Sequence, residues 1–102
     1  MDIITGLKRV LKTGKIEIGM NKTANLVKNG KAKVVIISEN CPKTSREDIM
    51  HYAEISGTPI VEFRGTSLEL GEICGKPFVV SGIAVTDCGD VKVKELTGEQ
   101  NG

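Results

Sequence analysis

The residues best suited to chemistry form one short stretch, Gly19-Met20-Asn21-Lys22-Thr23-Ala24-Asn25. An apolar alternation at residues 16–18 precedes it, so a strand is predicted to end in a glycine turn where a helix begins. The first turn of a helix has unpaired N–H groups and a partial positive charge, which suit phosphates. The amide of Asn21 and the ammonium of Lys22 can also bind the acceptor edges of purines. The alternative is an ordinary helix cap, in which the Asn21 side chain bonds a backbone N–H of its own helix.

Composition limits the classes of protein to which the chain can belong. Its 102 residues suffice for one domain, predicted at residues 1–96, followed by a polar tail at 97–102. No apolar run approaches the roughly 18 residues of a membrane span, and Lys8, Arg9 and Lys12 interrupt any signal peptide. The spacing of the cysteines and the single histidine do not fit a usual zinc cluster. We therefore expect a reduced cytoplasmic protein, monomeric when free, without metal, cofactor or membrane contact.

The net charge of +1 conceals an uneven distribution of charge along the chain. Residues 1–46 hold ten Lys and Arg against three Asp and Glu, a net charge of +7. Residues 47–102 hold four Lys and Arg against ten Asp and Glu, a net charge of −6. Halves of opposite sign predict one basic face, which would suit a nucleic acid. The alternative is that folding intermixes the two halves.

Apolar periodicity predicts alternating helices and strands. Helices are expected at residues 3–12, 21–29, 45–56 and 67–74, and strands at 16–18, 34–37, 60–63 and 79–85, with an edge strand at 91–96. A capping box at Ser45–Asp48 is predicted to open the third helix. Such alternation indicates an α/β fold, a three-layer α/β/α sandwich with a mixed sheet of four to five strands. Helical crossovers predict that much of this sheet is parallel.

Ligands of open α/β sheets bind beside the carboxyl ends of the strands. In this chain those ends are predicted at residues 19–21, 38–40 and 64–67. The first two lie in the basic half, so the sheet rule and the charge distribution select the same edge.

Common enzyme motifs are absent from the sequence. No glycine-lysine pair has the glycine and hydroxyl of a P-loop, and no glycines have the spacing of a dinucleotide-binding motif. The segment from Cys41 to Arg46 superficially resembles a phosphatase loop, but it is one residue too short to wrap a phosphate. His51 has no obvious nucleophile to activate. We therefore predict that the protein is not an enzyme.

Three segments, in this order and spacing, resemble the ribosomal protein L-thirty-e family of the archaeal and eukaryotic large subunit. They are Gly30-Lys31-Ala32-Lys33-Val34-Val35-Ile36-Ile37, Asp48-Ile49-Met50-His51-Tyr52-Ala53, and Glu69-Leu70-Gly71 continuing through Gly75-Lys76 to Ile83-Ala84-Val85-Thr86-Asp87-Cys88-Gly89. The resemblance covers residues 3 to 93. It implies an α/β/α sandwich that binds a kink-turn, an RNA helix bent sharply at an internal loop beside sheared G·A pairs. Such RNA exposes purine edges and splays out one base.

The resemblance also implies roles for individual residues. Gly19 would let the backbone approach the RNA, while Asn21 and Lys22 would contact the G·A purines and adjoining phosphates. Asn40 matches an asparagine that reads a base, although it could be only a turn former. The further contacts that the resemblance implies are Thr23 and Asn25 with the RNA backbone and the loop Pro77-Phe78-Val79 with the extruded nucleotide. Lys28, in the basic half, is also expected to lie near phosphates. Phe78 could instead cap the core.

Two classes of function remain open at this stage. The first is a structural component of the large ribosomal subunit that binds a kink-turn of ribosomal RNA, with neighbouring ribosomal proteins as further partners. Within this class, the alternative is a sister kink-turn protein of a guide-RNA particle. The second class is a small-ligand or phosphate-binding α/β module centred on Cys41 and Arg46.

Overall fold

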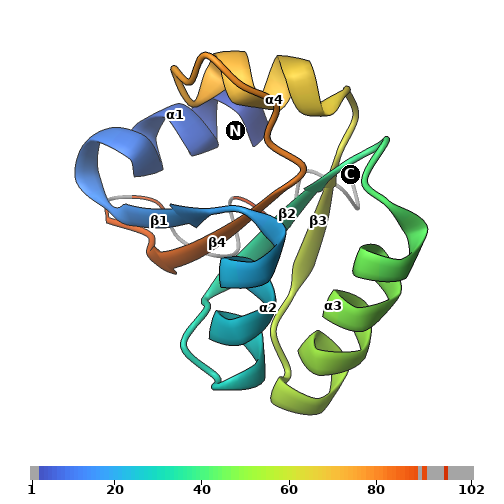
Figure 1. Cartoon of the computed structure of the whole chain (residues 1–102). Coiled ribbons are helices and arrows are strands. Elements are labelled where there is room, and N and C mark those ends of the chain that lie inside the picture. Colours follow the sequence, from blue (N-terminus) through green and yellow to red (C-terminus); the bar gives the residue numbers. More distant parts are fainter. Residues whose placement is uncertain (1–2, 90, 92–95, 97–102) are drawn as a thin grey trace.

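The computed structural model describes residues 3–89, 91 and 96 of the chain. Within these residues, four helices alternate with four strands (Figure 1). In chain order the elements are α1 (Ile3–Thr13), β1 (Lys15–Ile18), α2 (Met20–Lys28), β2 (Val34–Ser38), α3 (Lys43–Ser56), β3 (Ile60–Phe63), α4 (Ser67–Ile73) and β4 (Gly82–Asp87).

Every element predicted between residues 3 and 85 is present, and four of them, β1, α2, α3 and β4, begin one to three residues away from the predicted position. β4 begins at Gly82 rather than at residue 79. The capping box at Ser45–Asp48 is wrong, because the N-cap of α3 is Pro42, three residues before Ser45, and the helix has no side-chain cap. The N–H of Arg46 already donates to the carbonyl of Pro42 at 2.9 Å, so Ser45 lies inside the first turn. The edge strand predicted at 91–96 and the tail at 97–102 lie outside the continuously described residues.

The four strands form one mixed sheet in the order β1-β4-β2-β3. β2 and β3 are parallel, whereas β4 is antiparallel to both of its neighbours, β1 and β2. The prediction of a mixed sheet is confirmed, but the prediction that much of it is parallel is wrong. α4 has seven residues, about 10 Å of helix, and the loop after it returns the chain to the edge where β3 ended. β4 therefore starts at that edge and runs in the opposite direction.

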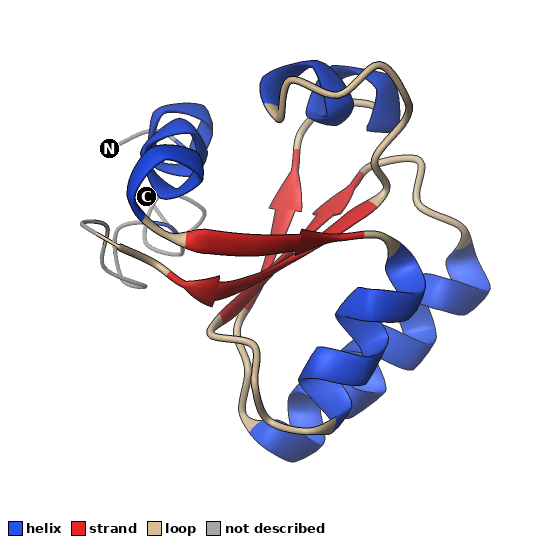
Figure 2. Ribbon diagram, turned by 60° about the vertical axis from the view of Figure 1, so that its left-hand side comes forward, coloured by secondary structure: helices blue, strands red, loops and turns tan. Residues whose placement is uncertain are grey.

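Helices cover both faces of the sheet, which confirms the predicted three layers (Figure 2). Successive side chains of a strand point to opposite faces, and β2 is buried along its whole length. Val34 and Ile36 pack in a core with residues of α1 and α4, such as Leu7 and Leu70. The residues between them, Val35 and Ile37, pack in a second core with Val27 of α2 and Ile49 of α3. The apolar run of β2 is thus shared between two cores.

No described helix combines the length and the apolar character that a membrane crossing requires.

The loop between α4 and β4 packs closely on α4. The N–H of Val80 donates to the carbonyl of Ser67 at 2.9 Å, and the N–H of Lys76 donates to the carbonyl of Gly71 at 2.9 Å. Gly71 is buried, and a Cβ at this position would overlap the backbone carbonyl of Phe78. Gly71 therefore sets how closely this loop approaches the helix.

Gly71→Ala should lower the free energy of unfolding by about 1–3 kcal/mol, because a side chain added to a packed site forces the backbone apart. Urea denaturation measures the change. Glu72→Ala, at the exposed neighbouring position of α4, is the matched control and should change stability by no more than about 0.5 kcal/mol. Equal stability of Gly71→Ala and the unmodified protein would show that the loop is not held against α4.

Candidate nucleic-acid interface

The segments predicted to bind a ligand meet at one edge of the sheet. β1, β2 and β3 all end there and β4 begins there. Three backbone hydrogen bonds of 3.0 Å join these segments, from the N–H groups of Gly19, Ser38 and Glu39 to the carbonyls of Gly82, Ser81 and Gly65. This surface, made of residues 19–22, 38–40, 64–67 and 78–82, is called the carboxyl edge below. The prediction that the strand ends share one edge is confirmed.

Gly19 forms the turn between β1 and α2. Its φ of 119° lies in a region that favours glycine, and a Cβ built on it would meet no atom within 4 Å. Gly19 is also the N-cap of α2, which has no side-chain cap. Asn21 therefore lies inside the first turn, exposed, and the alternative that it caps its own helix is wrong. The side chains of Asn21 and Lys22 extend from the N-terminal turn of α2 at the carboxyl edge.

Other predicted contacts on α2 lie at different distances from this edge. Lys22 forms an ion pair of 3.7 Å with Glu17. Because both side chains are exposed, solvent screens this pair and it contributes little to stability. Lys22 and Asn25 also line a hollow of about 310 Å³ beside β1. Lys28 lies six residues, about 9 Å, further along the helix, where its ammonium is 5.8 Å from the centre of the Tyr52 ring. The structure therefore brings Asn25 near Lys22 and leaves Lys28 at the other end of α2.

Thr23 lies beneath the surface. Its side chain is 0% exposed, and its hydroxyl has no hydrogen-bond partner among the described residues. A Cβ built on Gly82 would lie 3.8 Å from this hydroxyl oxygen, so Thr23 packs where α2 crosses the start of β4. The expectation that Thr23 touches the RNA backbone is corrected, because a side chain so buried supports the surface without being part of it.

Asn40, just beyond β2, is held by two neighbours. Its Oδ1 accepts a hydrogen bond from the Ser38 hydroxyl at 3.1 Å and another from the backbone N–H of Ser67 at 2.8 Å. These bonds connect the end of β2 with the start of α4. Asn40 does act as a turn former, as the alternative supposed, but only through its oxygen. Its NH₂ group has no partner among the described residues and lies on an exposed residue.

An open groove of about 590 Å³ separates the β1–α2 junction from the loop before β4. Phe78 and Val79 line the groove although they are 54% and 59% exposed. The alternative that Phe78 caps the core is therefore wrong. Pro77 is exposed beside them but does not line the groove. The remaining lining residues are Leu11, Ile16, Glu17, Ile18, Gly19, Met20, Lys22, Cys74, Lys76, Val80 and Ser81.

The groove contains residues that the sequence did not single out as contacts. Lys76 faces the groove that Lys22 also lines, and Ile18 and Met20 contribute apolar surface on the side of β1. Their positions in the sequence could have indicated these residues, because Ile18 and Met20 flank Gly19 and Lys76 precedes Pro77. The groove thus combines a flat apolar wall with two ammonium groups.

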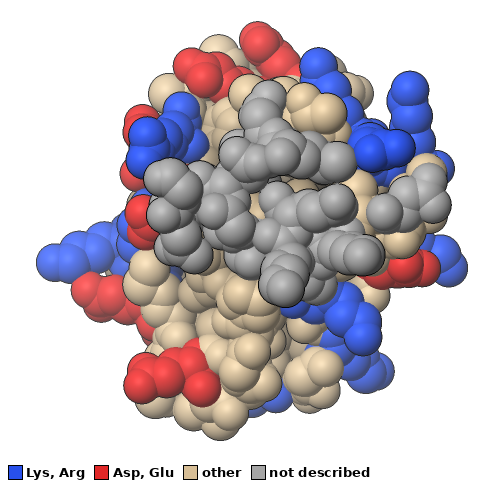
Figure 3. Space-filling model, turned by 180° about the vertical axis from the view of Figure 1, so that it is seen from behind, with Lys and Arg blue, Asp and Glu red and all other residues tan. Residues whose placement is uncertain are grey.

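Charges of both signs share the face of the molecule shown in Figure 3, where Lys and Arg occur beside Asp and Glu. Arg46 of the basic half forms an ion pair with Glu62 of the acidic half at 2.7 Å. This ion pair supports the alternative that folding intermixes the two halves. The cations relevant to an anionic ligand are therefore the individual ones at the groove.

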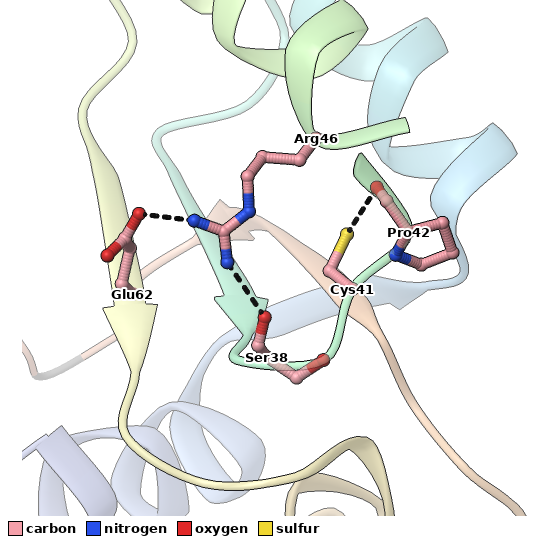
Figure 4. Close-up of polar contacts among 5 residues, drawn as sticks. All are labelled: Ser38, Cys41, Pro42, Arg46 and Glu62. Atoms are coloured by element: carbon pink, nitrogen blue, oxygen red, sulfur yellow. Dashed lines mark hydrogen bonds and ion pairs between the residues drawn. The ribbon is translucent and has the colours of Figure 1, made fainter. Parts of the chain in front are cut away.

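The segment from Cys41 to Arg46 lacks the features of a phosphatase loop (Figure 4). The Cys41 thiol is buried and donates to the Pro42 carbonyl at 3.6 Å. Burial raises the pKa of Cys41, although the positive charge of Arg46 opposes this shift, so the thiol stays protonated at neutral pH. The guanidinium of Arg46 is occupied by Glu62 and the Ser38 carbonyl. Among the described residues, no group of three acidic, cysteine or histidine side chains could hold a metal ion.

Comparison with known proteins identifies the family. The closely matching relatives include three proteins called large ribosomal subunit protein eL30. The protein of Methanothermobacter thermautotrophicus is 40% identical over 96% of this chain and 100% of its own length. The protein of Methanopyrus kandleri is 44% identical over 82% of this chain and 77% of its own. The protein of Methanocaldococcus jannaschii is 38% identical over 100% of this chain and 93% of its own.

A solved structure supports the fold alone. It is a Bacillus halodurans protein of unknown function, with a TM-score of 0.67, 20% identity, and coverage of 83% of this chain and 82% of its own. The model of the ribosomal protein L7Ae/L30e/S12e/Gadd45 family matches residues 1–95. Because this match spans nearly the whole chain and the relatives are so similar, the chain belongs to the ribosomal protein L7Ae/L30e/S12e/Gadd45 family.

Proposed function

We propose that this protein is a structural component of the large ribosomal subunit, which clamps a kink-turn of ribosomal RNA at its carboxyl edge. The ribosomal role is supported by the names of three archaeal relatives. The kink-turn is supported by one observation above all. The exposed side chains of Asn21 and Lys22 lie in the first turn of α2, and Lys22 lines a groove that Phe78 and Val79 also line.

The carboxyl edge and the groove beside it suit the two unusual parts of a kink-turn. Sheared G·A pairs present purine acceptors in a widened groove, and the amides of Asn21 and Asn40 can donate hydrogen bonds to them. The absence of a side chain at Gly19 leaves room for the RNA to approach the backbone. The extruded base meets Phe78 and Val79, because aromatic and apolar surface binds an unstacked base without regard to its identity.

Phosphate contacts complete the clamp. Lys22 and Lys76 line the same groove, and the Lys22 ammonium can exchange its weak contact with Glu17 for a phosphate. Asn25 can reach the backbone of the same strand beside Lys22. Lys28 would contact phosphates only where the RNA continues along α2 towards its C-terminal end.

The two alternatives to a ribosomal role are less well supported. A kink-turn protein of a guide-RNA particle would use the same edge, but the names of the relatives favour the ribosome, and hence the cytoplasm, as the place of work. The phosphate-binding module centred on Cys41 fails on its chemistry, because the thiol is buried and protonated while Arg46 has other partners. As a member of a family of ribosomal proteins, the chain is a structural protein and not an enzyme.

Kink-turn RNA should bind more tightly than a straight duplex of the same length, because only the bent loop offers splayed purines. Filter binding at several salt concentrations measures both affinities. Lys22→Ala should reduce the slope of log affinity against log salt by about one unit, the expectation for one lost phosphate contact. Lys8→Ala, an exposed lysine of α1, is the control and should leave the slope unchanged. Equal affinity for the two RNAs at moderate salt would contradict the proposed function.

Phe78→Ala should weaken kink-turn binding by about 1–3 kcal/mol, the usual contribution of a base stacked on an aromatic ring. Its melting temperature should change little, because more than half of the side chain is already exposed. A buried phenylalanine would instead lose about 3–5 kcal/mol of stability. Ile55→Ala removes an even more exposed apolar side chain from the far end of α3 and should leave RNA affinity intact. If Phe78→Ala melts early but binds normally when folded, Phe78 does not belong to the site.

A further inference from the structure

The guanidinium of Arg46 joins three elements next to the carboxyl edge. Figure 4 shows it between β3 and the end of β2, with its side chain coming from α3. Its Nη1 donates to Glu62 Oε1 at 2.7 Å, and its Nη2 donates to the backbone carbonyl of Ser38 at 3.3 Å. The N–H of Cys41 donates to the same carbonyl, also at 3.3 Å. The Ser38 carbonyl is therefore where Arg46 meets the turn that carries Asn40.

Ser38 is connected to Asn40 through its side chain as well. Its backbone is fixed in the sheet by the hydrogen bond from its N–H to Ser81, and its side chain is fully buried. From this position its hydroxyl donates to Asn40 Oδ1, which also accepts the N–H of Ser67. Both bonds engage the amide oxygen, so the NH₂ group of Asn40 is the part left for a ligand. It can donate to a purine acceptor, such as N3, N7 or the O6 of guanine, but the oxygen cannot turn outward to accept.

We propose that the Arg46–Glu62 pair is a positioning device for RNA recognition, which holds the Ser38–Asn40 turn so that the Asn40 NH₂ group faces the purine edge. This inference rests on the proposed function, because the orientation of the Asn40 amide matters only if Asn40 contacts RNA. Arg46 acts here through Asn40 and is not itself a contact. The planar fork of an arginine suits the task, because it bonds a carboxylate and a carbonyl at once in fixed directions, whereas a lysine presents a single charged point.

Two simpler roles for the pair make different predictions. The first is an ion pair that only stabilises the fold. Such a pair contributes little where its members are exposed, and Glu62 is half exposed. It would alter melting without altering the affinity of the folded protein. A direct contact of Arg46 with a phosphate would change the dependence of affinity on salt, and its effect would not depend on Asn40. Because Glu62 neutralises Arg46 at 2.7 Å, the structure favours the positioning role.

A double-mutant cycle tests the proposal. Affinity for kink-turn RNA is measured for the unmodified protein, Arg46→Gln, Asn40→Ala and the double variant. Arg46→Gln should weaken binding by roughly three- to thirtyfold, which lies within the range for coupled residues in one network, with an unchanged salt slope. This loss should vanish in the Asn40→Ala background. Arg46→Lys should fail to restore affinity, although it keeps the charge. Arg9→Gln, which removes an exposed arginine from α1, is the matched control and should bind normally.

Three results would overturn the proposal: normal affinity of Arg46→Gln, a loss that adds to that of Asn40→Ala, or full rescue by Arg46→Lys. If Arg46→Gln does not fold, Glu62→Gln takes its place in the same cycle.

A separate measurement in the free protein is the hydrogen exchange of the Ser67 N–H, which Arg46→Gln should accelerate and Arg9→Gln should not. Unchanged exchange contradicts the positioning role whatever the RNA result. If exchange accelerates but the unmodified protein binds kink-turn and duplex alike, the proposed function has failed, and the RNA role of the pair fails with it.

Discussion

The antiparallel insertion of β4 between β1 and β2 is the constraint on which the candidate interface depends. β4 starts at the edge where the other three strands end, and two backbone hydrogen bonds of 3.0 Å, Gly19 to Gly82 and Ser38 to Ser81, fix its first residues there. Through this start, the loop with Phe78 comes to face the first turn of α2. A sheet with β4 at its margin would leave the apolar and polar sides of the groove apart.

The close approach of α2 to β4 depends on the lack of a side chain at Gly82. A Cβ at this position would lie 2.5 Å from the sulfur of Met20 and 3.8 Å from the hydroxyl oxygen of Thr23. Met20 and Thr23 occupy the inner side of the first turn of α2, while Asn21 and Lys22 are exposed on its outer side. Helical periodicity thus divides four consecutive residues into a supporting pair and a pair available to a ligand.

Features governed by local sequence could be predicted. The β-branched run at 34–37 identified the central strand, Gly19 marked the start of α2, and the predicted strand ends do share one edge of the sheet. The direction of β4 could not be predicted, because it depends on how a short helix and its loop return the chain, which no local pattern records. The capping box at Ser45 failed because a nearby start at Pro42 competed with it.

The individual site residues show the same division between local and tertiary information. The exposure of Asn21 and Lys22 agrees with their polar side chains, whereas the burial of Thr23 and the remoteness of Lys28 follow from packing and helix length. Sequence reasoning listed Cys41 and Arg46 as a candidate phosphate site. The structure instead shows Arg46 bonded to Glu62 and to the strand end that precedes Asn40, and no sequence motif indicates these bonds.

The central claim is that the carboxyl edge is the surface that meets RNA. Titration of the ¹⁵N-labelled protein with a kink-turn RNA, followed by the backbone amide resonances, tests it most directly. The largest changes should occur at residues 19–22, 38–40 and 78–82, which approach one another only in the folded sheet. Changes concentrated at the opposite ends of α2 and α3, around Gly30 and Gly57, with the carboxyl edge unaffected, would contradict the account.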